Sequence, residues 1–261
     1  MSFSVLTYNI WFDLSDRKDR TESLCATIAD SDPDILCLQE VVSDVYTDLK
    51  SLLTSYKYYF PENINKSYGC AIMSKYPIVE SKDIPFRSTA MDRSLIIVSI
   101  DMPIIKKEGD YITTTKHRIL AATAHFESRF KKKEINADKI DQYDETYEIL
   151  EKIYSKNKTP IVFSSDTNLM PHEEENFFPG KPQNGWIDCW EVNKNSDQKF
   201  TYDYYTNNNL KLKNVGKFRS RLDRILYKSE EFKMSKYSLI LGIIGMIAPS
   251  DHHGVCAQFA F

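Results

Sequence analysis

The sequence of 261 residues lacks an apolar run of the length that crosses a membrane. Its longest uncharged apolar run, residues 237–250, is shorter than the roughly 20 residues that a membrane-spanning helix needs, and two glycines and Pro249 interrupt it. Lysine and arginine are absent from the first twelve residues, so the chain does not begin like a secretory signal, and SFSVLTYNIW is better interpreted as a first strand. We therefore expect neither a membrane span nor a membrane partner.

Closely spaced cysteine pairs are also missing. The five cysteines are odd in number, widely scattered and mostly inside apolar runs: Cys25, Cys37, Cys70, Cys189 and Cys256. Without a CxxC pair, the sequence offers no basis for a tetrahedral zinc cluster. The pattern favours reduced thiols in the protein interior and an intracellular location, nuclear or cytoplasmic, with disulfides or a zinc site as the weaker alternatives.

The chain has no excess of positive charge. Its formal net charge is −3, which argues against a protein that coats nucleic acid indiscriminately, because phosphate binding depends on clustered lysine and arginine. Any contact with a polyanion must therefore be local. Two basic clusters could provide it, SRFKKK at 128–133 and KLKNVGKFRSR at 211–221, although most such runs taken alone are solvated faces.

Repeats, low-complexity tracts and linkers rich in proline or serine are absent as well. The content of 42% hydrophobic and 27% charged residues is typical of a globular protein. We therefore expect a single domain that spans residues 1–261 and has a substantial core.

Short runs rich in isoleucine, valine, leucine, phenylalanine and tyrosine predict strands. These runs lie at 5–11, 35–41, 70–76, 94–100, 119–127, 160–166, 221–227 and 254–261. Helical periodicity is present at 21–29, before Pro33, and at 134–154. Adjacent strands without an intervening helix, as from 70 to 102, disfavour a wholly parallel doubly wound sheet. We predict an α/β (α+β) chain, a two-layer β-sandwich flanked by helices, with functional loops at 171–217.

Polar side chains lie at the ends of five of the predicted strands: Asn9, Gln39 and Glu40, His125, Asp166 and Asn168, and Asp251 and His252. Each has an ordinary interpretation when taken alone. Glu40 could be a surface acid, His125 a satisfied histidine, and Asp166 a turn cap. Five separated strand ends with this chemistry favour an active site on a rigid scaffold instead.

Six motifs in order, TYNIW, LQEV, TAHFES, SDTN, RLDRIL and SDHHG, resemble those of the endonuclease/exonuclease/phosphatase superfamily of Mg²⁺-dependent phosphodiesterases. The resemblance covers residues 5–255 and implies the DNase I-like fold of that superfamily. It also implies a single catalytic domain with Mg²⁺, or possible Mn²⁺, as cofactor. The segments 84–93, 125–128, 165–170, 190–192 and 249–254 further resemble the tyrosyl-DNA phosphodiesterases within it.

The narrower resemblance implies hydrolysis of the bond between a protein tyrosine and a DNA 5′ end, the adduct that trapped topoisomerase II leaves. The expected partners are single-stranded or frayed DNA 5′ ends, and the expected state is a monomer consisting of the catalytic core. A general DNA or RNA phosphodiesterase, such as an abasic-site endonuclease or an enzyme that unlinks RNA from protein, is the alternative. A catalytically inactive nucleic-acid-binding scaffold is disfavoured, because Glu40, Asp166, Asn168 and His252 are all present.

The resemblance also assigns roles to particular residues. The catalytic set is Asp166 as general base, Asn168 holding the water or the phosphate, His252 oriented by Asp223, and His125. The expected metal ligands are Glu40, Asn9 and Asp251, since Mg²⁺ prefers oxygen. The expected substrate contacts are Tyr68, Ser128, Arg129, Tyr202, and Arg93 in a cation–π contact with the departing tyrosine.

Two residues depart from the family pattern. His253 occupies a position where the resembling enzymes have tryptophan, and we expect it to pack or to line the groove. Met170 occupies a position where the resembling enzyme has an arginine that helps to hold the substrate. Either Arg129 or Lys131 replaces the lost charge, or the substrate contact differs.

Overall fold

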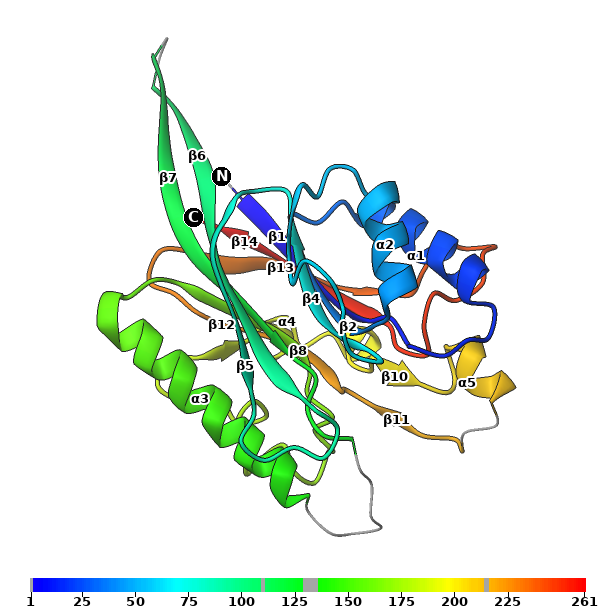
Figure 1. Cartoon of the computed structure of the whole chain (residues 1–261). Coiled ribbons are helices and arrows are strands. Elements are labelled where there is room, and N and C mark those ends of the chain that lie inside the picture. Colours follow the sequence, from blue (N-terminus) through cyan, green and yellow to red (C-terminus); the bar gives the residue numbers. More distant parts are fainter. Residues whose placement is uncertain (1, 109–110, 129–135, 214–215) are drawn as a thin grey trace.

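A computed structural model describes residues 2–108, 111–128, 136–213 and 216–261. Two six-stranded sheets pack face to face, and helices cover their outer faces (Figure 1). The predicted α+β sandwich flanked by helices is therefore confirmed. Among the described residues, no helix is both long and apolar enough to cross a bilayer.

The first sheet has the order β13-β14-β1-β2-β4-β3. Its strands are β1 (Ser2–Asn9), β2 (Ile35–Val41), β3 (Tyr58–Phe60), β4 (Gly69–Ser74), β13 (Lys233–Ile240) and β14 (Gly254–Ala260). β1 and β2 are parallel, because helix α1 (Arg17–Ser31) carries the chain back between them. Helix α2 (Ser43–Leu52) packs with α1 on the outer face of this sheet (Figure 1).

The second sheet has the order β5-β6-β7-β8-β12-β9. Its strands are β5 (Ile78–Pro85), β6 (Ser94–Glu108), β7 (Tyr111–Ala124), β8 (Ile161–Asp166), β12 (Asp223–Lys228) and β9 (Ile187–Asp188). β7 and β8 form its parallel pair, joined through α3 (Ala137–Asn157), which covers the outer face. The β6–β7 ribbon extends beyond the rest of the sandwich (Figure 1).

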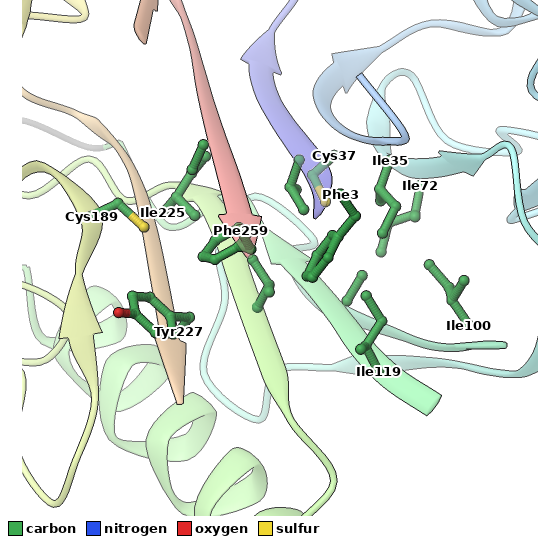
Figure 2. Packing of buried hydrophobic residues seen from close by; sticks show 14 of the residues in the cluster. Phe3, Ile35, Cys37, Ile72, Ile100, Ile119, Cys189, Ile225, Tyr227 and Phe259 are labelled. Carbon is green, nitrogen blue, oxygen red and sulfur yellow. The ribbon is translucent and has the colours of Figure 1, made fainter. Parts of the chain in front are cut away.

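The main hydrophobic core lies between the two sheets. Phe3, Ile35 and Phe259 of the first sheet meet Ile119 and Ile225 of the second (Figure 2). Alternate residues of each strand point to this layer, and the intervening residues pack under the helices. Because both faces of the central strands are buried, these strands are almost continuously apolar until their polar ends.

Several predicted boundaries were wrong. The first helix extends from Arg17 to Ser31, and not from 21 to 29, because buried polar residues such as Arg20 and Ser23 obscure its apolar period. The second predicted helix, 134–154, ends later, at Asn157. α2 was missed, since a ten-residue helix shows too few turns of periodicity.

The region 171–217 was expected to be loops, and it also contains short regular elements. They are β9, α4 (Cys189–Asn193), the 3₁₀ turn η1 (Ser196–Gln198), β10 (Tyr202–Asp203) and α5 (Asn208–Leu212). β10 pairs with β11 (Arg219–Ser220) in a small separate sheet. Elements of two to five residues are held by their surroundings, so sequence periodicity does not reveal them.

Candidate active site

The polar strand ends meet at one edge of the sandwich. Parallel pairing of β1 with β2 places Asn9 opposite Gln39, and a bridge that continues the β7–β8 pair joins His125 to Asp166. The antiparallel β12 then brings Asp223 opposite Asp166. Since parallel neighbours end on the same side, the two central strand pairs deliver their terminal side chains to one place.

The carboxylates of Glu40 and Asp166 lie beside the same amide. Asn9 Nδ2 donates to Glu40 Oε1 at 3.2 Å and to Asp166 Oδ2 at 2.8 Å. The oxygen of that amide, Oδ1, accepts a hydrogen bond from the backbone N–H of Trp11 at 3.0 Å. Asn9 is therefore a donor that joins the two carboxylates here, and its role as a metal ligand stays a prediction.

His252 is paired with Asp223. Its Nδ1 lies 2.8 Å from Asp223 Oδ2, and its Nε2 lies 4.0 Å from Asp166 Oδ2. Burial opposes a charge on this imidazole, but the carboxylates of Asp223 and Asp166 outweigh it and raise the pKa of His252 well above its usual value. The charged imidazolium is therefore favoured, and its Nε2–H points to the side of the site where Asp166 lies.

His125 has the opposite protonation state. Its Nδ1 lies 2.8 Å from Nη1 of Arg93, and a guanidinium can only donate, so Nδ1 accepts and the ring proton is on Nε2. Nε2 lies 3.3 Å from Asp166 Oδ2 and 3.8 Å from Glu40 Oε1. Burial, reinforced by the charge of Arg93, lowers the pKa of His125 to about 3. The imidazole is neutral at physiological pH and donates toward the carboxylates.

Asp166 is held as a carboxylate although it is buried. Burial alone would raise its pKa, but His125 and His252 lower the pKa below its ordinary value. The backbone N–H of Asn168 also donates to Asp166 Oδ1 at 3.0 Å. Asn168 has a φ of 48°, and its Nδ2 donates to the carbonyl of Phe126 at 3.0 Å. The chain therefore turns sharply after β8 and returns the Asn168 side chain to the site.

Glu40 and Asp251 provide the donor set that a divalent cation requires. Burial and then the nearby Asp251 charge raise the pKa of Glu40 to about 7, and burial also raises that of Asp251. Within the described residues, neither carboxylate has a lysine or arginine within ion-pair distance. Buried acids without a cationic partner are costly, and a hard cation with oxygen ligands would remove that cost. The residues present fit Mg²⁺ or Mn²⁺.

Ligand atoms of Asp166, Asp223 and His252 also lie within 4.8 Å of one another, which suggests a second arrangement for a metal. We favour Glu40 and Asp251, because His252 already uses Nδ1 to bind Asp223 and because Mg²⁺ prefers oxygen to imidazole nitrogen.

A cleft of about 460 Å³ opens over these groups. Its lining includes the polar groups Glu40, His125, Asp166, Asn168 and His252, together with Ser128, Met170, Tyr202, Phe218 and Leu222. The Tyr202 ring meets the His252 ring edge to face at 5.1 Å. Ser128 and Tyr202 are thus at the cleft, as predicted for substrate contacts, and Arg129 lies outside the described residues.

Tyr68 and Arg93 lie on the other side of His125, where a second hollow of about 190 Å³ includes all three. Tyr68 stacks on Phe12 with ring centroids 4.7 Å apart, and the Arg93 guanidinium lies 5.2 Å from the Tyr68 ring. Arg93 is only 5% exposed. Its guanidinium is already engaged by Tyr68 and His125, so its predicted contact with a departing tyrosine stays a prediction.

The two departures from the family pattern have different surroundings. Met170 lines the cleft and brings no charge there. His253 is buried, and its Nε2 lies 2.9 Å from Thr206 Oγ1, so it packs beneath the site.

Sequence reasoning missed the buried polar residues that support the site from behind. Glu127 accepts three hydrogen bonds at one oxygen, from Thr89 Oγ1 and from the backbone N–H groups of Ala90 and Met91, at 2.7 to 2.9 Å. It thereby shapes the segment that leads to Arg93. The signal that could have revealed such residues is a polar side chain at a position whose neighbours in the strand or helix are apolar.

Comparisons with known proteins identify the family. The family model described as "Endonuclease/Exonuclease/phosphatase family" matches residues 6–252. Tyrosyl-DNA phosphodiesterase 2 of Xenopus laevis is 28% identical over 269 residues, which cover 98% of this chain and 66% of that protein. The chain therefore spans about two thirds of the length of this relative.

Solved structures of similar proteins confirm the fold. A crystal structure of D. rerio TDP2, complexed with single strand DNA product, has a TM-score of 0.80 at 24% identity and covers 100% of this chain and 99% of that one. A truncated Caenorhabditis elegans TDP2 has a TM-score of 0.82 at 24% identity and covers 100% of this chain and 98% of that one. At this identity the likeness establishes the architecture.

Proposed function

The chain belongs to the endonuclease/exonuclease/phosphatase family, and from this premise we propose that it is a divalent-metal-dependent phosphodiesterase that removes tyrosyl adducts from DNA 5′ ends. The observation that carries the proposal is the meeting of Glu40, Asp166 and the Asp223–His252 pair in one cleft. These side chains come from four strand ends far apart in the sequence. A scaffold that only bound nucleic acid would not need this combination of a buried carboxylate base, a charged imidazole and acids that, among the described residues, have no lysine or arginine within ion-pair distance.

The proposed mechanism uses water as the nucleophile. Asp166, held as a carboxylate beside the two histidines, accepts a proton of the attacking water as the water oxygen bonds to phosphorus. The bond from phosphorus to the tyrosyl oxygen breaks, and the tyrosine leaves as its phenolate, while Asn168 positions the water or the phosphate. The imidazolium of His252 donates a hydrogen bond from Nε2 to a phosphoryl oxygen, and the neutral His125 donates a hydrogen bond from its Nε2–H from another side. A Mg²⁺ bound by Glu40 and Asp251 would add positive charge near the non-bridging and leaving oxygens.

The proposed substrate is a single-stranded or frayed 5′ end. Tyr202 and Phe218, which line the cleft, provide aromatic faces on which an unstacked base can lie. The relatives named tyrosyl-DNA phosphodiesterase 2, one of which was crystallised with a single-stranded DNA product, support DNA as the polymer and tyrosine as the leaving group. Topoisomerase II adducts are the protein–DNA links with this chemistry that we propose as the biological target.

Two substrates separate this proposal from a general nuclease. An oligonucleotide carrying a 5′-phosphotyrosine and an abasic-site duplex of equal length are incubated in parallel with Mg²⁺, with Mn²⁺ and with EDTA. We expect faster release of tyrosine than incision at the abasic site, and no product in EDTA.

A higher rate on the abasic duplex would overturn the tyrosyl assignment in favour of an abasic-site endonuclease, and a 5′-tyrosyl RNA control tests the RNA–protein alternative. Product formed at the full rate in EDTA would contradict the dependence on metal. If the wild-type protein formed no product from any of these substrates, the remaining hypothesis would be a catalytically inactive scaffold that binds nucleic acid.

We also propose that the protein acts as a monomer inside the cell, in the nucleus or the cytoplasm. All five cysteines are free in the structure, which supports a reducing compartment. Mass measurement by light scattering in a reducing buffer tests the monomer, and a dimer mass would contradict it.

A further inference from the structure

We propose that Lys139 and Glu173 are positioning residues that hold Asn168 in its working conformation from behind. The inference rests on the proposed function, because it assumes that Asn168 contacts the water or the phosphate. Neither residue lines the cleft, and both are almost completely buried, Lys139 at 4% and Glu173 at 3% exposure.

Lys139 and Glu173 form an ion pair that also binds the loop after β8. Lys139, in the first turn of α3, donates from Nζ to Glu173 Oε2 at 2.7 Å and to the backbone carbonyl of Asn168 at 3.0 Å. The same Glu173 oxygen accepts the backbone N–H of Met170 at 2.8 Å. The pair therefore fixes one carbonyl and one amide on either side of the residue that follows Asn168.

The backbone at this turn has an uncommon conformation. Asn168 has a φ of 48°, in the left-handed region that asparagine adopts more readily than other residues except glycine. Tyr143, one turn further along α3, donates its hydroxyl to the carbonyl of Thr167 at 2.6 Å. Tyr143, Lys139 and Glu173 thus hold backbone groups of Thr167, Asn168 and Met170, on both sides of the turn.

The backbone groups that the Lys139–Glu173 pair binds indicate a positioning role and not only a contribution to stability. Buried ion pairs contribute little net stability, since desolvation offsets their attraction. α3 carries a second pair of this kind, in which Lys228 Nζ of β12 donates to Glu151 Oε1 at 2.6 Å. Glu151 also accepts from Trp186 Nε1, and that pair binds no backbone group of the catalytic loop. Of these two ion pairs, the Lys139 pair is the one that binds backbone groups of residues following Asp166.

The test is a double-mutant cycle with a matched control. Lys139→Met is made in the wild type and in the Asn168→Ala background, and Lys228→Met serves as the control. kcat and KM on the 5′-phosphotyrosyl oligonucleotide are measured with Mg²⁺, below the unfolding temperature of every variant.

We expect Lys139→Met to lower kcat by about 10- to 100-fold with KM changed by less than about 2-fold, because a displacement of about 1 Å in a catalytic group has this effect. In the Asn168→Ala background, the same substitution should change kcat by less than about 2-fold. Lys228→Met should leave kcat unchanged. An equal loss of kcat in both backgrounds, or an equal loss in Lys228→Met, would overturn the inference.

A second variant and a second readout keep the test independent of folding and of activity. The double variant Lys139→Met/Glu173→Gln leaves no unpaired charge, so it should fold and show the same kcat loss. In NMR spectra, Lys139→Met should shift the side-chain amide resonances of Asn168, identified by their absence in Asn168→Ala, and Lys228→Met should not. Unmoved resonances would refute the positioning role, whereas inactivity of the wild type would refute only the proposed function.

Discussion

At the scale of single residues, the site depends on two histidines in opposite protonation states. His252 faces Asp223 and Asp166, whose charges favour its imidazolium, whereas His125 faces the guanidinium of Arg93, which favours its neutral form. Both lie beside the same carboxylate, Asp166, whose pKa is below its ordinary value although it is buried. Neighbouring charges, and not residue type, therefore decide which histidine can donate from a charged ring.

Replacing Glu40 or Asp166 by the neutral amide should change the melting temperature of the protein in different ways. In EDTA at pH 8, we expect Glu40→Gln to raise the melting temperature by a few degrees, because the substitution removes an acid whose pKa is raised to about 7. The stabilisation should be on the order of 2 kcal/mol. Asp166→Asn should not stabilise, since the pKa of Asp166 is lowered and its charge is favourable in the folded protein. Thermal unfolding measures both.

The sign of this effect follows from linkage. A carboxyl whose folded pKa is raised binds more protons in the folded than in the unfolded state, so its ionisation destabilises the fold as the pH rises from about 4 to above 7. Both variants should lose at least about a hundredfold in kcat with Mg²⁺. Wild-type turnover in both would contradict the assignment of the site, and equal changes in melting temperature would contradict the charge argument.

At the scale of elements, strand β12 separates the site from a buried ionic cluster. Adjacent residues of a strand point to opposite faces, so Asp223 points to His252 while Arg224 points away from it. Arg224 and the preceding Arg221 both donate to Asp188 Oδ2, at 3.2 and 2.7 Å. The end of β9 is thereby fastened to the strand that carries Asp223.

Loss of the acid in that cluster should be costly. Asp188→Asn leaves two buried guanidinium groups without a full countercharge, and we expect a loss of about 3 to 5 kcal/mol in the free energy of unfolding. Asparagine can still cap α4, where Asp188 accepts from Trp190 N, so the loss would report the charge.

Glu191→Gln is the matched control. Glu191 is 49% exposed at its side chain and lies 3.7 Å from Arg221, so its loss should cost under about 1 kcal/mol. Urea unfolding measures both variants. Equal losses in the free energy of unfolding for Asp188→Asn and Glu191→Gln would show that burial of the Asp188 ion pairs does not add to their effect on stability.

At the scale of the whole molecule, the sandwich presents its catalytic groups at one edge and few cations around them. The basic cluster predicted at 211–221 is smaller than its sequence indicates. Arg221 is buried against Asp188, and Lys213 pairs with Asp13 at 2.5 Å. Of the five cations of the cluster this leaves Lys211 on α5, and Lys217 and Arg219 beside the cleft residue Phe218. The first cluster, 128–133, lies outside the described residues from 129 onward.

DNA binding should therefore depend on salt only moderately. With roughly two to three phosphate contacts, each contributing a slope of about −0.7 for a single strand, we expect the affinity for a 5′-phosphorylated oligonucleotide to fall about tenfold between 50 and 200 mM salt. Fluorescence anisotropy measures it. An affinity that does not change over this range would contradict a basic groove, and a fall of a thousandfold would require many more cations than the described residues place there.

The sequence by itself determined the class of fold and pointed to candidate site residues that the structure brings together. Strand patterns are local, and a polar residue such as Asn9 or Glu40 at the end of an apolar run is visible without coordinates. Because six such motifs follow one another in a characteristic order, the family could be inferred as well. Exact helix ends and the short elements of 171–217 could not, since packing against distant residues stabilises them.

Only the tertiary structure decided how these residues act on one another. The proton positions of His125 depend on Arg93, the inward direction of Arg221 depends on Asp188, and the support of Asn168 depends on Lys139, each a neighbour across at least 29 positions of sequence. Hydrogen bonds and charge interactions act over a few ångströms in space. Sequence spacing carries no information about such distances until the sheets have brought the strand ends together.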